Sequence, residues 1–83
     1  MLYDIVEVKV IKNHTLYLRF ENGEEGEVDI AEIIPFKGVF AVLKDTKYFA
    51  TVHLNKELGT IVWDNGADLS PSDLYSIIVK KVA

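Results

Sequence analysis

The sequence contains no cysteine, and this absence excludes several kinds of chemistry. Without thiols the chain forms neither disulfide bonds nor thiolate metal sites, and it has no cysteine nucleophile. It has only one arginine, Arg19, and its only adjacent lysines are Lys80 and Lys81. Proteins that bind nucleic acid without base specificity normally present clustered basic side chains, so we expect no direct contact with DNA or RNA.

Long apolar runs are also missing. No stretch approaches the roughly 20 apolar residues that a membrane-spanning helix requires. The first nine residues mix acidic and apolar side chains and lack the basic beginning of a signal peptide. We therefore expect a cytoplasmic protein with no membrane partner.

The remaining composition is that of a folded domain. The chain has 83 residues, of which 49% are hydrophobic and 27% charged, and its formal net charge is −4. This length is enough for one domain and too short for two, so we expect residues 1–83 to form a single domain. The acidic balance favours solubility and a basic partner, but it does not identify that partner.

Alternation of apolar and polar residues predicts an antiparallel meander of about three strands. The segment Val6–Val10 alternates valine with charged residues, which places its valines on one face of a half-buried strand. A second strand is expected at about Leu16–Phe20 and a third at about Glu25–Ile30. Asn22-Gly23 between them predicts a type I′ turn, because both central residues of that turn need positive φ.

Short helical turns and two further short strands are expected in the middle of the chain. Capping patterns predict single helical turns at Asp29–Glu32 and Asp45–Phe49. Ala50–Asn55 alternates like a strand, and Thr60–Trp63 is rich in the β-branched and aromatic residues that strands prefer.

One helix is expected at the end of the chain. Ser70 can cap it, Pro71 suits the first helical position, and Asp73 can close the capping box. Leu74 and Ile78 belong to its predicted buried face. The predicted fold class is thus α+β: an antiparallel meander of about three strands, two further short strands, short helical turns and one C-terminal helix.

Three aspartates, Asp64, Asp68 and Asp73, lie close enough in sequence to suggest a metal site. Calcium needs six or more oxygen ligands, and this segment matches only fragments of a calcium-loop spacing. Turn and capping roles explain the same residue types, with Asn65 and Gly66 forming a turn, Asp68 bonding loop amides, and Ser70 and Asp73 capping the helix. We therefore expect no metal and no other cofactor.

No set of residues typical of a catalytic site is evident. His14 and His53 are the only histidines, and neither has a second histidine at ligand spacing. A catalytic base also needs an orienting partner and a nucleophile in a pocket. The sequence therefore predicts that the protein is not an enzyme.

Trp63 has two interpretations. It can be a core residue whose indole N–H is bonded to a carbonyl, or a recognition residue at an interface. In the second case Trp63 and Tyr75 form an exposed aromatic patch. A pocket between the sheet and its loops is a further alternative, with a lining of Phe40, Tyr48, Phe49 and Trp63.

Several segments resemble a known family. They are Gly38–Ala41, Leu58–Trp63, Asn65–Leu69 and the pair Leu74-Tyr75. On these residues the sequence is similar to the bacterial domain-of-unknown-function family 2442 (DUF2442). Val42, Thr46 and Asp64 stand where prolines are common in that family.

The resemblance implies a small α+β domain in which a curved sheet packs on short helices, with no assigned activity. Some longer members of the family carry a helix-turn-helix domain. Stand-alone members are often encoded beside another small protein, in an arrangement like a toxin–antitoxin pair.

Two functions follow as hypotheses. The first is a protein-interaction or accessory module, antitoxin-like or regulatory, whose partner is another small protein. Its expected contact elements are an exposed sheet edge and the patch of Trp63 and Tyr75, and an open edge also allows a homodimer. The alternative is a small-ligand sensor that uses the aromatic pocket.

Overall fold

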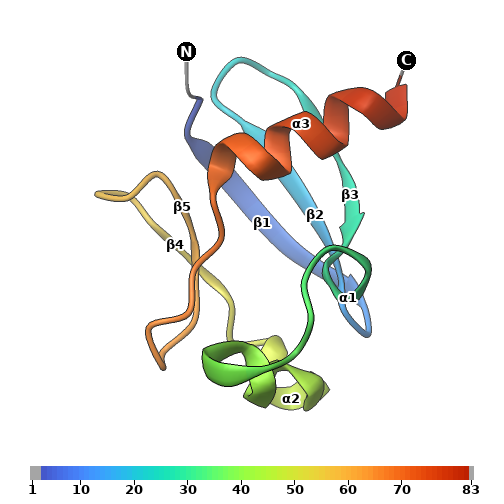
Figure 1. The fold of residues 1–83 in the computed structure, drawn as a ribbon. Coiled ribbons are helices and arrows are strands. Elements are labelled where there is room, and N and C mark those ends of the chain that lie inside the picture. Colours follow the sequence, from blue (N-terminus) through green and yellow to red (C-terminus); the bar gives the residue numbers. More distant parts are fainter. Residues whose placement is uncertain (1–2, 83) are drawn as a thin grey trace.

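Three antiparallel strands form the main sheet of the protein (Figure 1). The structure is a computed structural model, and it describes residues 3–82. The strands lie in the order β1 (Ile5–Lys12), β2 (Thr15–Phe20) and β3 (Glu25–Asp29). The predicted three-stranded meander is confirmed.

The turn between β2 and β3 differs from the predicted type I′ turn. Gly23 has a φ of 92°, but Asn22 does not have positive φ. The Gly23 amide donates to the Phe20 carbonyl, and the Phe20 amide donates to the Glu24 carbonyl. This pattern belongs to a three-residue turn, in which only the last residue needs the left-handed conformation. The Asn22 carboxamide oxygen accepts from the Glu24 amide at 3.2 Å and holds the turn in this form.

A bulge near the start of β1 changes the predicted alternation of its valines. Ile5 pairs with Phe20 while Glu7 pairs with Arg19, so β1 carries one extra residue at this point. Ile5 therefore takes the core position and is 4% exposed, whereas Val6 is 40% exposed. The prediction that Val6 shares a buried face with the later valines is wrong, because a bulge shifts the two-residue period.

A second sheet consists of β4 (His53–Asn55) and β5 (Thr60–Val62), which pair antiparallel beside β1 (Figure 1). β4 is shorter than the predicted Ala50–Asn55, because residues 50–52 donate their amides back into the preceding helical turn. Gly59 lies between the two strands with a φ of 69°, and its carbonyl accepts from the Ile5 amide at 2.9 Å. That bond ties the second sheet to the first.

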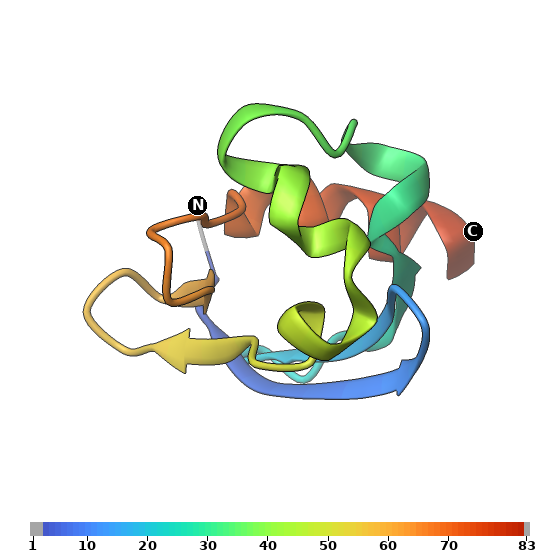
Figure 2. The same cartoon turned by 90° about the horizontal axis from the view of Figure 1, so that it is seen from below.

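Short helical segments follow the meander: α1 (Ile30–Ile33), the 3₁₀ helix η1 (Gly38–Lys44) and α2 (Thr46–Phe49). The predicted caps are present. The Asp29 carboxylate accepts from the Ala31 amide, and the Asp45 carboxylate accepts from the Lys47 amide. Figure 2 shows these segments on the same side of the main sheet as the last helix.

The last helix, α3 (Pro71–Val82), begins with proline at its first position, as predicted. The Asp73 amide donates to the Ser70 hydroxyl at 3.4 Å, and Leu74 and Ile78 are buried against the sheet. A Cβ on Gly26 of β3 would lie 3.0 Å from the Ile78 side chain, so glycine allows α3 to lie close to the sheet. The fold class is α+β.

The hydrophobic core lies between the main sheet and the helical segments. Its buried members come from every strand except β4 and from all helical segments: Ile5, Leu16, Leu18, Phe20, Val28, Ile30, Leu43, Phe49, Ile61, Trp63, Ala67, Leu69, Leu74 and Ile78. Among residues 3–82, none of the helices has the length and apolar character needed to cross a membrane.

Candidate functional site

Trp63 lies in the core. Its side chain is 2% exposed, and its indole N–H donates to the Phe49 carbonyl at 2.9 Å. Its ring also packs against the Phe49 ring, with centroids 5.6 Å apart. The core interpretation of Trp63 is therefore confirmed, and its interpretation as an exposed recognition residue is wrong, because the pairing with Phe49 leaves no indole surface for a partner.

Tyr75 lies in a different cluster from Trp63. Its ring packs against Tyr3 and Phe20, with centroids 5.3 and 5.1 Å away, and its hydroxyl accepts from the Asn22 side chain at 3.0 Å. Tyr75 is half-buried. The structure does not join Trp63 and Tyr75 into one exposed patch.

The other aromatic residues expected around a pocket are packed into the fold. Phe49 is fully buried, and Phe40 and Tyr48 are partly buried against the same core. The two cavities described below are lined by other residues. The aromatic lining proposed from the sequence therefore belongs to the hydrophobic core.

The Asn65-Gly66 turn has the structural role expected from the sequence. Gly66 has a φ of 91°, and its amide donates to the Trp63 carbonyl. The Asn65 side chain accepts from the Ala67 amide and donates to the Val39 carbonyl, which ties the turn to η1. Asp68 follows with an exposed side chain and a backbone bridge to Val62.

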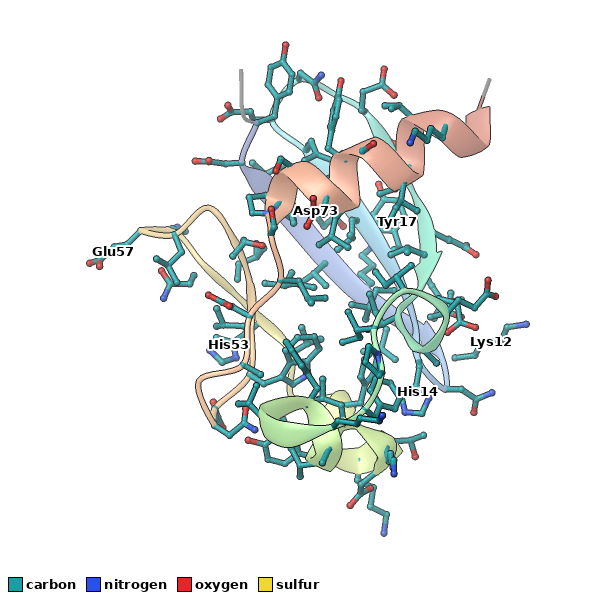
Figure 3. The ribbon with its side chains drawn as sticks, viewed as in Figure 1. Lys12, His14, Tyr17, His53, Glu57 and Asp73 are labelled. Carbon is teal, nitrogen blue, oxygen red and sulfur yellow. The ribbon has the colours of Figure 1, made fainter. Side chains whose placement is uncertain are left out.

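The two histidines have separate environments. The ring of His14 packs between Phe36 and Phe49, and its Nε2–H donates to the Leu43 carbonyl at 2.7 Å. Figure 3 shows His14 and His53 on different elements. His53 is exposed, and its Nδ1 lies 3.9 Å from the Asp64 carboxylate. Among the residues that the structure describes, no group of three or more His, Asp or Glu side chains is arranged to hold a metal ion.

An open groove lies between the end of α1 and the first half of α3. It has a volume of about 350 Å³. We call it the α1–α3 groove, and its lining residues are Ile33, Ile34, Leu69, Ser70, Asp73, Leu74, Ser76 and Ile77.

The lining of the α1–α3 groove is apolar with a polar rim. Isoleucine and leucine side chains from two distant segments supply the apolar part, and the hydroxyls of Ser70 and Ser76 supply neutral polar groups. Asp73 is the one charged residue of this lining, and it lies on the first turn of α3 (Figure 3). The groove can therefore accept an apolar group that carries a positive charge or a hydrogen-bond donor next to it.

Of the residues singled out in the sequence, the groove brings together only Ser70 and Asp73. The Ser70 hydroxyl also caps α3 by accepting from the Asp73 amide. Sequence reasoning missed Ile33, Ile34 and Ile77 as possible site residues. The sequence did contain an indication of these residues, because the pair Ile33-Ile34 stands directly before Pro35, which ends the helix. A helix that ends so early cannot bury both isoleucine side chains.

A second, smaller cavity of about 200 Å³ lies where the start of β1 meets the β4–β5 hairpin. Its lining combines charged and apolar residues: Asp4, Ile5, Val6, Glu21, Leu54, Lys56 and Gly59. Most of these residues belong to the contact between the two sheets, so the cavity is a consequence of how the hairpin packs on β1.

The outer face of the main sheet carries a charged network. The Glu7 carboxylate lies 3.2 Å from the Lys9 amine and 3.0 Å from the Arg19 guanidinium. Hydrogen bonds from Lys9 and then Arg19 lower the pKa of Glu7 below its ordinary value. Partial burial, followed by the negative charges of Glu25 and Glu7, raises the pKa of the neighbouring Tyr17.

These features define a small α+β domain with an open apolar groove and a charged outer sheet face. The family described as protein of unknown function (DUF2442) has a family model that matches residues 5–80, so the chain belongs to this family. The resemblance stated from the sequence is confirmed. No curated protein and no solved structure gives a significant match to the sequence.

Proposed function

We propose that the protein is an interaction module that binds another small protein through the α1–α3 groove. The observation that carries this proposal is the open apolar lining formed by Ile33, Ile34 and Ile77. These side chains pack against the core on one side and remain partly exposed in the groove. Interface anchors are usually apolar side chains that fill a pocket of this kind on the partner.

Charge gives the expected chemistry of the partner. The chain has a formal net charge of −4, and the one charged residue in the groove lining is Asp73. Complementary charge mainly raises the association rate and selects among partners. The proposed partner therefore presents an apolar side chain flanked by lysine or arginine, as one face of an amphipathic helix does.

An accessory role, antitoxin-like or regulatory, is part of this proposal, and so is a cytoplasmic location. The support for both is the resemblance of the sequence to small bacterial proteins encoded beside another small protein. A non-catalytic role is also part of it. Glu7 and Tyr17, whose pKa values are shifted, lie on the outer sheet face, and neither lines the groove.

Co-expression with the product of the adjacent gene tests the proposal. The two proteins are expected to elute together in size-exclusion chromatography at micromolar concentration. Ile77→Lys places a charge in the groove and is expected to separate them. Val79→Lys is the matched control, because it makes a similar change on α3 at a position outside the groove lining. Separate elution of the unmodified proteins would contradict the proposal.

Asp73→Lys tests the charge preference in the same assay. Reversing the carboxylate is expected to weaken binding of a basic partner. Asp68→Lys makes the same change at an exposed position outside the groove and is expected to have little effect. Thermal unfolding of each variant alone confirms that it remains folded. Equal weakening by both variants would indicate a general charge effect and would count against the groove.

A small-ligand sensor is the second candidate, and the size of the groove favours it. A volume of about 350 Å³ lies within the range of small-molecule sites, which begins at roughly 300 Å³. A ligand that binds only the folded state raises the melting temperature. Screening by thermal shift is expected to find amines with an apolar body, and Ile77→Lys is expected to abolish the shift. The absence of a shift across a broad panel would contradict this candidate.

A further inference from the structure

The cavity where the start of β1 meets the β4–β5 hairpin, which we call the sheet–hairpin cavity, contains charges of both signs. Asp4 and Glu21 each contribute a carboxylate to its lining, and Lys56 contributes an amine. Within residues 3–82, none of these three side chains has a hydrogen-bond or ion-pair partner. The two carboxylates and the amine are therefore available to a ligand.

The carboxylates and the amine come from the two different elements that form the cavity. Asp4 and Glu21 lie at adjacent ends of β1 and β2, where the Glu21 amide donates to the Asp4 carbonyl at 2.9 Å. Lys56 directly follows β4 in the hairpin, which lies beside the start of β1 (Figure 1). Figure 3 shows the neighbouring Glu57 at the hairpin tip, directed away from β1, and it does not line the cavity. A ligand between the two elements can therefore meet both signs of charge.

Gly59 allows the hairpin to approach the Asp4 carboxylate closely. Gly59 is buried and has a φ of 69°, and its carbonyl accepts from the Ile5 amide at 2.9 Å. A Cβ at this position would collide with the Asp4 carboxylate. A glycine in such a place permits close approach of a backbone that a side chain would prevent. The hairpin thus lies against β1 without displacing the carboxylate from the cavity.

The bulge in β1 adds an apolar side chain to the cavity. Because β1 carries an extra residue between Ile5 and Glu7, Val6 leaves the core face and is 40% exposed. Val6 lines the cavity together with Leu54 of β4. Bulges often re-aim a side chain beside a functional site. The sheet–hairpin cavity therefore has an apolar part next to its charged groups.

We propose that the sheet–hairpin cavity binds a small aliphatic amino acid in its zwitterionic form. The ammonium group of the ligand contacts Asp4 and Glu21, and its carboxylate contacts Lys56. Its aliphatic side chain packs against Val6 and Leu54. The cavity volume of about 200 Å³ is several times the roughly 30 Å³ of a water molecule, and it is below the roughly 300 Å³ at which sites for drug-sized ligands begin. The size thus fits a small ligand such as valine.

Titration of the full chain with L-valine, followed by backbone-amide NMR, tests the proposal. Isobutylamine is valine without its carboxylate, and isovalerate is valine without its ammonium group. Valine is expected to bind in the millimolar range, and each analogue about fivefold more weakly, because exposed charge pairs contribute modestly. Absence of binding at millimolar valine, or an analogue that binds as tightly as valine, would overturn the proposal.

Lys56→Gln removes the positive charge of the cavity. It is expected to weaken valine binding about fivefold but not to weaken binding of isobutylamine, which has no carboxylate for Lys56 to contact. Lys44→Gln on η1 is the matched control, because Lys44 is exposed and lies outside the cavity lining. Equal weakening of valine binding by both variants would indicate a general charge effect and would overturn the proposal.

Asp4→Asn combined with Glu21→Gln removes both negative charges of the cavity. This double variant is expected to weaken binding of valine but not of isovalerate, which has no ammonium group. Glu32→Gln combined with Asp68→Asn removes the same charge at exposed positions outside the lining and is expected to leave both affinities unchanged. Valine binding that ignores the loss of Asp4 and Glu21 would contradict the assigned position of the ammonium group.

The amides of Val6 and Gly59 report where valine binds. Their NMR signals are expected to shift during the titration, and shifts confined to α3 would overturn the proposal. Val6→Phe fills the cavity from an exposed position and is expected to abolish binding, with thermal unfolding confirming that the variant is folded. Ile77→Lys is expected to leave valine binding unchanged, because no residue lines both the sheet–hairpin cavity and the α1–α3 groove. The result is therefore independent of whether the groove binds a partner.

Discussion

The indole N–H of Trp63 donates a 2.9 Å hydrogen bond to the carbonyl of Phe49, and the rings of the two residues pack against each other in the core. The bond joins the end of β5 to the end of α2. By this bond Trp63, which the sequence suggested as a possible recognition residue, connects two elements of the core.

Trp63→Phe is therefore expected to lower the free energy of unfolding by about 2–4 kcal/mol. The substitution leaves a cavity, and it removes one of the two donors to the buried Phe49 carbonyl, which keeps only the Val52 amide. Urea denaturation followed by circular dichroism measures the change. Tyr17→Phe, on the outer sheet face, is the control and is expected to change stability by much less. A loss below about 1 kcal/mol for Trp63→Phe would show that the bond and packing are unimportant.

Gly59 and Gly66 both have positive φ, but they differ in their surroundings. A Cβ at Gly59 meets the Asp4 carboxylate, whereas a Cβ at Gly66 has no atom within 4 Å. Gly66→Ala is expected to cost about 1–2 kcal/mol from backbone strain. Gly59→Ala is expected to cost more, because Asp4 must also move.

Adding Asp4→Ala to Gly59→Ala isolates that contact. The double variant is expected to recover the part of the loss that exceeds the cost of Gly66→Ala, and a double-mutant cycle in urea denaturation measures this coupling. Additive effects of Asp4→Ala and Gly59→Ala would show that Asp4 does not contribute.

The lowered pKa of Glu7 predicts a pH dependence of stability. A carboxyl whose pKa is lower in the folded than in the unfolded state stabilises the fold above its unfolded pKa, and this stabilisation disappears as the pH falls through the folded pKa. The ordinary value for this group is 4.5, so the loss is expected below that pH.

Glu7→Gln is expected to flatten this part of the pH profile, measured as the urea midpoint at successive pH values. The difference from the unmodified protein is expected to shrink at high salt, because Lys9 and Arg19 are accessible to solvent. An identical slope below pH 4.5 in both proteins would contradict the role of Glu7.

Much of the fold could be predicted because its causes are local. Alternation identified β2 and β3, and side-chain caps at Asp29 and Asp45 identified the helical turns. The bulge at Val6 could not be predicted from a two-residue period, because it depends on how β1 pairs with β2.

The candidate site was less predictable than the fold. Ile33 and Ile34 meet Ile77 only because α3 returns across the sheet, and no local pattern encodes that contact. The burial of Trp63 also depends on a distant carbonyl, that of Phe49. In the sequence, the aspartates of the Asp64–Asp73 segment suggested a metal site. The groove is instead formed mainly by isoleucine and leucine side chains.

Thr60 is expected to control the position of the α1–α3 groove. Its buried hydroxyl donates to the Leu69 carbonyl, just before the residue that caps α3, and Leu69 itself lines the groove. Thr60→Val keeps the shape of the side chain but removes the donor, leaving a buried carbonyl unsatisfied at a cost of about 1–3 kcal/mol.

Thr60→Ser retains the hydroxyl and is expected to preserve most of that hydrogen bond. Urea denaturation compares the two variants, and hydrogen exchange at the Leu74 amide reports on the first turn of α3, since this amide donates to the Ser70 carbonyl. Faster exchange at Leu74 in Thr60→Val than in Thr60→Ser is expected, because the segment before α3 has lost its attachment to β5. Equal exchange in both variants would show that the start of α3 is positioned by its apolar contacts alone.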